Sequence, residues 1–232
     1  MQRWRFVLVP ALVFTALTAC GGGGGSKADQ GRSIADQAGL PKDVADFFAL
    51  AATGTQATYR VSLDTTDSKG AKLQVTTTQR PPDVRVDTFH ADGTIDATLS
   101  TKGQRYECTR ANDQWQCGDL GPSSASSGDV FDTSAVQLAV DRFRQRATDY
   151  DFRVEHRTIA NVGATCLVTS RKAGHDQDPS LGASATLCLS AEGAILRAET
   201  AAGTLSASSY STDIPGDAFA LPAPISSSSP SS

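Results

Sequence analysis

The chain has 232 residues, and 39% of them are hydrophobic, enough to bury the core of a globular domain. Its formal net charge is −4; without the two arginines of residues 1–19, 19 basic and 25 acidic residues give −6. This acidic balance argues against a nucleic-acid partner and against a polybasic patch for a membrane surface.

The first nineteen residues have the features of an export signal. Two arginines precede an almost unbroken apolar run, Phe6 to Leu17, which is too short to cross a bilayer. The run Leu17-Thr18-Ala19-Cys20 resembles the lipobox of bacterial lipoproteins. This resemblance implies cleavage before Cys20, a lipid on the Cys20 sulfur and acylation of the new amino terminus. In the alternative, an ordinary secretory signal ends at Ala19 and leaves Cys20 as an odd thiol.

The rest of the chain divides by composition into three parts. Residues 20–39 are predicted to be the lipidated cysteine and a flexible tether, because a Gly/Ser run follows Cys20 and polar residues follow that run. Residues 40–222 are predicted to form a single domain. Residues 223–232 are rich in serine and proline, which predicts a disordered tail.

The first helix is expected to begin at Pro41, which suits the first turn of a helix. Val44, Phe47, Phe48 and Ala51 recur at helical spacing, and the helix should end near Thr53-Gly54. Thereafter the hydrophobic period changes to two, with turn signals between short runs up to residue 109. That pattern predicts an antiparallel meander with one buried and one solvated face.

A hairpin is predicted around residues 111–114, with Cys108 facing Cys117 on neighbouring strands. A second amphipathic helix should begin at Asp132 or Ser134 and bury Val140, Phe143 and Tyr150. Strands resume at Phe152 and continue to about residue 212. The order is therefore helix, about five strands, helix, about five strands. It predicts an α+β fold: a curved, mostly antiparallel sheet, or half-barrel, packed by two or more amphipathic helices.

Four cysteines remain when Cys20 is set aside, and an even number in an exported chain favours disulfides. The strand pattern favours two local bridges, Cys108–Cys117 and Cys166–Cys188. Free buried thiols and a zinc site are the alternatives, although neither pair has the close spacing of a zinc ligand pair.

The lipobox, the glycine run, the early helix with Phe47-Phe48, the meander and the closing stretch Tyr210 to Pro222 together resemble the lipid-carrier lipoproteins of the LolA and LppX/LprG type. The resemblance covers roughly Leu40 to Pro222 and consists mostly of architecture. It implies a half-barrel plugged by helices, with an apolar cavity that carries acyl chains.

The function expected from this reading is a non-enzymatic, membrane-anchored protein on the extracytoplasmic face, which binds a lipid or acyl chain between sheet and helices. The expected ligand contacts are Val44, Phe47, Phe48, Val140 and Phe143. Alternatively these side chains fill an ordinary core, and the protein is a cell-surface interaction or sensor domain that uses a loop such as 172–182. A third hypothesis is a chaperone whose partner is another exported lipoprotein.

Catalytic signals are weak, so no enzyme activity, cofactor or metal is expected. The sequence contains no nucleophile elbow, zinc-protease motif or phosphate-binding glycine loop. His90 and His156 are interpreted as polar surface residues. The stretch His175-Asp176-Gln177-Asp178 has the composition of a divalent-ion site, but a solvated polar hairpin loop is the preferred interpretation.

Overall fold

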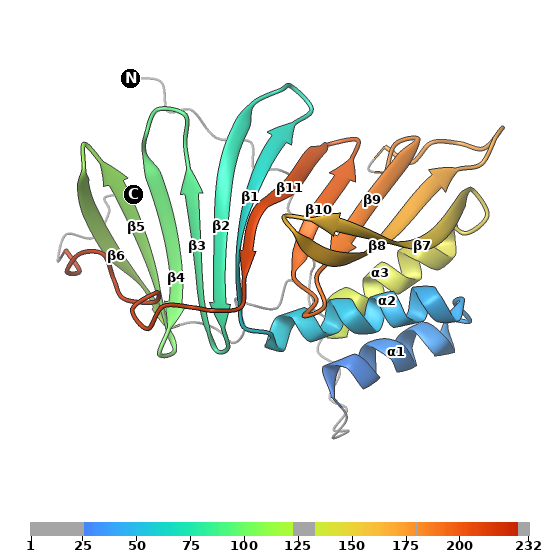
Figure 1. The fold of residues 1–232 in the computed structure, drawn as a ribbon, viewed down its shortest axis with the longest axis horizontal. Coiled ribbons are helices and arrows are strands. Elements are labelled where there is room, and N and C mark those ends of the chain that lie inside the picture. The colour runs from blue at the N-terminus through green and yellow to red at the C-terminus, as the bar shows by residue number, and fades with distance from the viewer. Residues whose placement is uncertain (1–25, 123–132, 180, 227–232) are drawn as a thin grey trace.

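The computed structural model describes residues 26–122, 133–179 and 181–226 as one sheet with three α-helices (Figure 1). The helices are α1 (Lys27–Gln37), α2 (Lys42–Thr53) and α3 (Thr133–Arg146), and a short 3-10 turn η1 (Gly54–Gln56) follows α2. The strands are β1 (Tyr59–Asp67), β2 (Lys72–Arg80), β3 (Asp83–Phe89), β4 (Ile95–Thr101), β5 (Gln104–Ala111), β6 (Gln114–Pro122), β7 (Tyr150–Ile159), β8 (Val162–Arg171), β9 (Ser184–Leu189), β10 (Ile195–Thr200) and β11 (Gly203–Ser211).

The eleven strands form an open antiparallel sheet in the order β6-β5-β4-β3-β2-β1-β11-β10-β9-β8-β7. Two meanders, β1–β6 and β7–β11, are joined in the middle by pairing of β1 with β11. The predicted fold class, α+β with a curved antiparallel sheet, is confirmed. The strand count is six before α3 rather than about five, because residues 114–122 continue the predicted hairpin as a full strand.

α2 has the predicted bounds, and the side chains of its apolar face are buried. Val44 and Phe47 are each 1% exposed, and Phe48 is 7% exposed. α3 carries Val140 and Phe143 as expected but ends at Arg146, and Tyr150 is the first residue of β7 instead of the last turn of the helix. Tyr150 happens to continue the helical spacing of the apolar residues of α3, although it lies in the strand. Such mismatches are common at element boundaries.

The predicted tether is wrong for residues 26–39, because Ser26 caps a helix that covers Lys27–Gln37. Ser26 caps α1: its hydroxyl accepts a hydrogen bond from the Asp29 amide at 3.2 Å, and Asp29 accepts one from the Ser26 amide in return. Gly31 lets α1 approach α2 closely, since a Cβ there would lie 3.0 Å from the Cβ of Ala52. Ala35 is fully buried in the same contact. A mostly polar helix is therefore part of the core.

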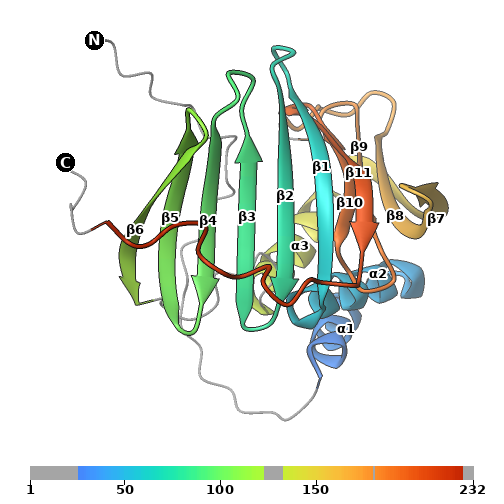
Figure 2. The same cartoon turned by 60° about the vertical axis from the view of Figure 1, so that its left-hand side comes forward.

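The chain after β11, residues 212–226 (the C-terminal segment), crosses the face of β2–β6 opposite to the helices (Figure 2). Arg80 donates to the carbonyl of Ile214 at 2.8 Å and lies over the ring of Phe219. Ile225 then pairs with Cys117 in a parallel bridge. The predicted disorder is thus wrong for residues 223–226, while residues 227–232 lie outside the described residues. The predicted signal, Cys20 and Gly21–Gly25 lie outside them as well.

The buried side chains form three clusters on the sheet. The first lies between the helices and β7–β10 and includes Leu167 and Leu189. The second surrounds the Cys166–Cys188 bridge, where β7 curls to contact β11, and also includes Val61 of β1. The third lies under the C-terminal segment and contains Ala97, Leu99 and the Cys108–Cys117 bridge. We call β7–β10 with α1–α3 the helix-covered half, and β1–β6 the meander half.

Candidate functional site

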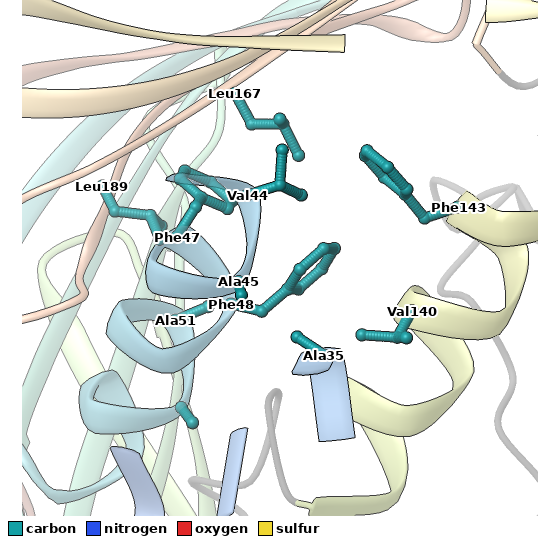
Figure 3. Packing of buried hydrophobic residues seen from close by; sticks show 11 residues of the cluster. Ala35, Val44, Ala45, Phe47, Phe48, Ala51, Val140, Phe143, Leu167 and Leu189 are labelled. Carbon is teal, nitrogen blue, oxygen red and sulfur yellow. The ribbon is translucent and has the colours of Figure 1, made fainter. Parts of the chain in front are cut away.

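The five residues predicted to contact a ligand are brought together, but they pack against one another (Figure 3). The ring centroids of Phe48 and Phe143 lie 5.8 Å apart in an edge-on arrangement, and those of Phe143 and Phe152 lie 3.6 Å apart. Exposure is 8% or less for all five, and zero for Val140. Leu167 and Leu189 close the sheet side of the cluster. The structure therefore places these side chains in a filled core between helices and sheet.

A second apolar surface lies on the meander half, on the face opposite the C-terminal segment. Register places Gln79 opposite Val84, Thr77 opposite Val86 and Val75 opposite Thr88, so that all six side chains share this face. We call Val75, Val84 and Val86, with the threonines between them, the valine face.

The valine face is less well covered than the helix core. Val75 and Val86 are half-buried, and Val84 is 9% exposed. None of the three valines belongs to any of the buried clusters of the described residues. At one end of this face, Gln79 donates to the carbonyls of Gly54 at 2.7 Å and Ala57 at 3.0 Å. The valine face therefore lies on the side of the sheet where α2 ends.

A groove of about 420 Å³ lies at the other end of β1–β3. Most of its lining residues are polar: it is formed by Asp64, Thr65, Thr66, Lys72, Leu73, Gln74, Phe89, His90 and Ala91. It is distant in the fold from the predicted ligand contacts on α2 and α3. Sequence reasoning missed it, because its residues come from three strands and one turn and share no motif.

A polar cluster links the sheet to the end of α2. Tyr210 donates a hydrogen bond to Glu192, and the Ser190 hydroxyl lies 2.9 Å from the same carboxylate. Burial would raise the pKa of Glu192, but the hydrogen bonds from Tyr210 and Ser190 outweigh it and hold this pKa below its usual range. Burial, and then the bond to Glu192, raise the pKa of Tyr210.

The position of this cluster explains its role. Thr53 donates to the carbonyl of Glu192, and a Cβ at Gly193 would lie 2.3 Å from the carbonyl oxygen of Leu50. Gly193 has a φ of +83°, which also favours glycine. The turn of residues 190–194 is thus packed on the end of α2, and Ser190 is fully buried. The arrangement docks a helix on a sheet, and its polar atoms are committed to that contact.

The remaining polar candidates take part in surface contacts. The ring nitrogen Nδ1 of His175 lies 3.0 Å from Asp149, and Asp178 pairs with Arg146 at 2.5 Å. His90 Nε2 lies 2.9 Å from Asp96. Among the described residues, no group of three or more histidine, cysteine and acidic side chains is arranged to hold a metal ion.

Both predicted disulfides are present, and the predicted cross-strand register of the hairpin is confirmed. Cys108 pairs with Cys117 across β5 and β6, and Cys166 pairs with Cys188 across β8 and β9. All four cysteines are at most 1% exposed. In residues 26–122, 133–179 and 181–226, no helix is long and apolar enough to cross a membrane.

Two solved structures resemble this chain distantly. No protein-family model matches the sequence, and no curated protein matches it. An uncharacterized conserved protein from Thermus thermophilus is 12% identical with a TM-score of 0.42, over 75% of this chain and 90% of that one. The Mycobacterium tuberculosis lipoprotein LppX is 14% identical with a TM-score of 0.34, over 72% and 97%. At these scores the likenesses carry no argument about function.

Proposed function

We propose that this protein is an exported, membrane-anchored binding protein, without catalytic activity, that holds an acyl chain of a lipid against the valine face. The observation that carries this proposal is the unequal cover of the sheet. The helices pack on β7–β10, and the C-terminal segment crosses one face of β2–β6. The valines of the other face remain outside the buried clusters of the described residues.

The chemistry of the valine face suits an acyl chain. Its side chains are Val75, Val84 and Val86, with Thr77, Thr88 and Thr98 between them, so the surface combines three valines with three threonines and carries no charged group among these six. Each CH₂ group of a ligand buried there contributes about 0.8 kcal/mol. A chain of ordinary lipid length would therefore be held by hydrophobic burial, without a charged partner in the site.

Membrane attachment is proposed to occur through a lipid on Cys20, on the strength of the lipobox. Replacing Cys20 with serine, in a chain whose own signal is exchanged for a secretory signal that is cleaved without a lipobox cysteine, should move the protein from the membrane fraction to the soluble fraction of the host. The same substitution should abolish incorporation of labelled palmitate. If the serine variant stayed in the membrane fraction, attachment through Cys20 would be disproved.

Ligand binding is tested by native mass spectrometry of the detergent-purified full chain before and after solvent extraction. The wild type should carry an additional mass in the lipid range, and extraction should remove it. The triple variant Val75→Thr, Val84→Thr, Val86→Thr keeps side-chain shape and strand propensity, and should lose that mass while remaining folded.

A matched control separates the valine face from the helix core. Val154 lies on β7 and packs against the helix core. Val154→Thr should keep the bound lipid. Loss of the lipid in this variant, with retention in the triple variant, would place the ligand beside Val44, Phe47, Phe48, Val140 and Phe143 instead.

A second candidate function, a surface interaction domain with no internal ligand, is favoured by the filled helix core. Its expected contact, the loop of residues 172–182, is held in place at its base: Lys172 donates its amide proton to the Asp149 carbonyl, and the Asp178 amide donates to the Tyr150 hydroxyl at 2.8 Å. A wild-type protein that shows no lipid mass from its native host membrane would favour this candidate.

A further inference from the structure

We infer that the anchored protein stands on the membrane by one particular end of its sheet: the rim formed by η1 and the β2–β3 and β4–β5 turns. This inference rests on the lipid anchor proposed at Cys20 and goes beyond it, since an anchor alone does not fix which surface faces the lipid. It also assigns the groove beside Asp64 and His90 to the opposite end.

The first step is the length of chain between the anchor and the fold. The capping contacts of Ser26 place the first turn of α1 directly after Gly25. Ser26 is six residues beyond Cys20, and a fully extended chain spans about 3.5 Å per residue, so Ser26 lies within about 20 Å of Cys20. A tether up to residue 39 would have allowed about 65 Å, and with it almost any orientation.

The second step is that α1 is fixed to the rest of the molecule. Gly31 lies against Ala52 and Phe48, Ala35 is fully buried, and Arg32 pairs with Asp46 at 2.9 Å. Because of these contacts, α1 is part of the folded domain and does not lengthen the tether.

The third step places Ser26 at one end of the sheet. α1 and α2 are joined by a short connection and pack antiparallel, since Gly31 contacts Ala52 while Arg32 pairs with Asp46. The start of α1 therefore lies beside the end of α2, and η1 leads from there into β1. Because β1–β6 are antiparallel neighbours, the β2–β3 and β4–β5 turns lie at this same end. The β1–β2, β3–β4 and β5–β6 turns lie at the other end (Figures 1 and 2).

This orientation has a consequence for the proposed ligand. Val84 is the second residue of β3, so the valine face begins at the rim that faces the membrane. An acyl chain could pass from the bilayer to Val84 without crossing the outer surface of the domain. The groove lined by Phe89 and His90 faces away from the lipid, where a partner outside the membrane would meet it.

The chain contains a natural reporter for this geometry. It has two tryptophans, Trp4 and Trp115, and cleavage before Cys20 would leave only Trp115. Trp115 is the second residue of β6, directly after the β5–β6 turn, at the end predicted to point away from the membrane. Ser33, an exposed residue of α1, provides a site for a reporter at the other end.

The experiment measures energy transfer from tryptophan to dansyl-labelled phosphatidylethanolamine in phosphatidylcholine vesicles that contain the lipidated full-length mature protein. The variant Ser33→Trp with Trp115→Phe should show transfer several-fold more efficient than the wild type, whose only donor is Trp115. Inserting twenty Gly/Ser residues between Gly25 and Ser26 should reduce that difference. Near-ultraviolet circular dichroism verifies that each variant is folded.

Equal transfer from the two positions, or stronger transfer from Trp115, would overturn the proposed orientation. A Cys20→Ser protein made with that secretory signal, and therefore without Trp4, serves as the reference for the anchor itself, and its transfer should fall to background. If this serine variant gave the same transfer as the lipidated protein, the lipid anchor and hence the proposed function would fail, which is a result distinct from a wrong orientation.

Discussion

The helix-covered half and the meander half belong to one continuous sheet, yet they bury their faces by different means. In the helix-covered half, aromatic rings from α2, α3 and β7 contact one another, and the opposite face is closed by the curl of β7 toward β11. In the meander half, one face is covered by a single extended segment, residues 212–226, and the other face carries half-buried valines.

This difference shows which part of the sheet has apolar side chains that no other element buries fully. The side chains of the three helices pack directly on those of β7–β10, so the helix core is filled. The C-terminal segment is one chain thick and covers only the face that carries Leu99 and the Cys108–Cys117 bridge. A ligand that needs apolar surface is therefore expected at the meander half, while the helix-covered half provides stability.

The largest contrast between the halves is expected from large-to-small substitutions. Phe47→Ala should lower the free energy of unfolding by about 3–5 kcal/mol, because the side chain is 1% exposed and its loss leaves a cavity in a filled core. Val86→Ala on the valine face should cost about 1 kcal/mol or less, because that side chain is only half-buried. Urea denaturation of both variants measures the difference, and equal losses would show that the two halves are packed alike.

Removing the disulfides should sharpen the same comparison. Loop-closure entropy predicts a loss of about 3.4 kcal/mol for the Cys166→Ala, Cys188→Ala double variant and about 2.6 kcal/mol for Cys108→Ala, Cys117→Ala, since the bridges close loops of 22 and 9 residues. Denaturation of each double variant under non-reducing conditions measures these losses. A larger loss for the shorter loop would mean that packing beneath the C-terminal segment, rather than chain entropy, governs the effect.

The contact between α1 and α2 provides a smaller and more local test. Gly31→Val places a branched side chain where a Cβ already lies 3.0 Å from Ala52 and 3.1 Å from the Phe48 carbonyl oxygen. The expected cost is about 1–3 kcal/mol, with α1 displaced from the core. Hydrogen exchange of the α1 amides should accelerate while that of β8 and β9 stays unchanged. Ser33→Val, at an exposed position of the same helix, is the matched control for strand-forming side chains. Unchanged exchange at Gly31→Val would contradict the close approach.

The sequence was sufficient to predict α2, the fold class, the register of the β5–β6 hairpin and both disulfides. Each of these depends on local periodicity or on a cysteine pair placed by that periodicity. α1 was missed because only Ile34 and small residues provide its apolar side, and its attachment depends on Gly31 and Ala35 meeting α2. Close approach of small side chains leaves no hydrophobic pattern in a sequence.

The candidate site was predictable only in part, for a physical reason. Helical spacing correctly grouped Val44, Phe47 and Phe48 on one face, and the structure brings Val140 and Phe143 to it. Whether such a group encloses a cavity or fills it depends on a few ångströms of separation between helices and sheet, which periodicity does not encode. The path of the C-terminal segment was equally hidden, because it is held by single contacts such as that of Arg80 with Phe219.

The smallest expected effect concerns pH and the turn between β9 and β10, where Glu192 accepts hydrogen bonds from Tyr210 of β11 and from Ser190. Because these bonds hold the pKa of Glu192 below its unfolded value, the ionised carboxylate stabilises the fold above that unfolded value, and the contribution disappears as pH falls through the folded pKa. Glu192→Gln should therefore lower the free energy of unfolding by about 1 kcal/mol at pH 7. At acid pH, below the lowered pKa, the variant and the wild type should converge.

The measurement is a pair of urea denaturation series between pH 7 and pH 3. Glu199→Gln, which removes a carboxylate paired with Arg197 on β10, is a control for the general effect of losing one negative charge. A constant difference between Glu192→Gln and wild type across this range would mean that the glutamate acts through shape rather than charge. Convergence only in the Glu192 variant would identify this carboxylate as the acid-sensitive contact between the end of α2 and the sheet.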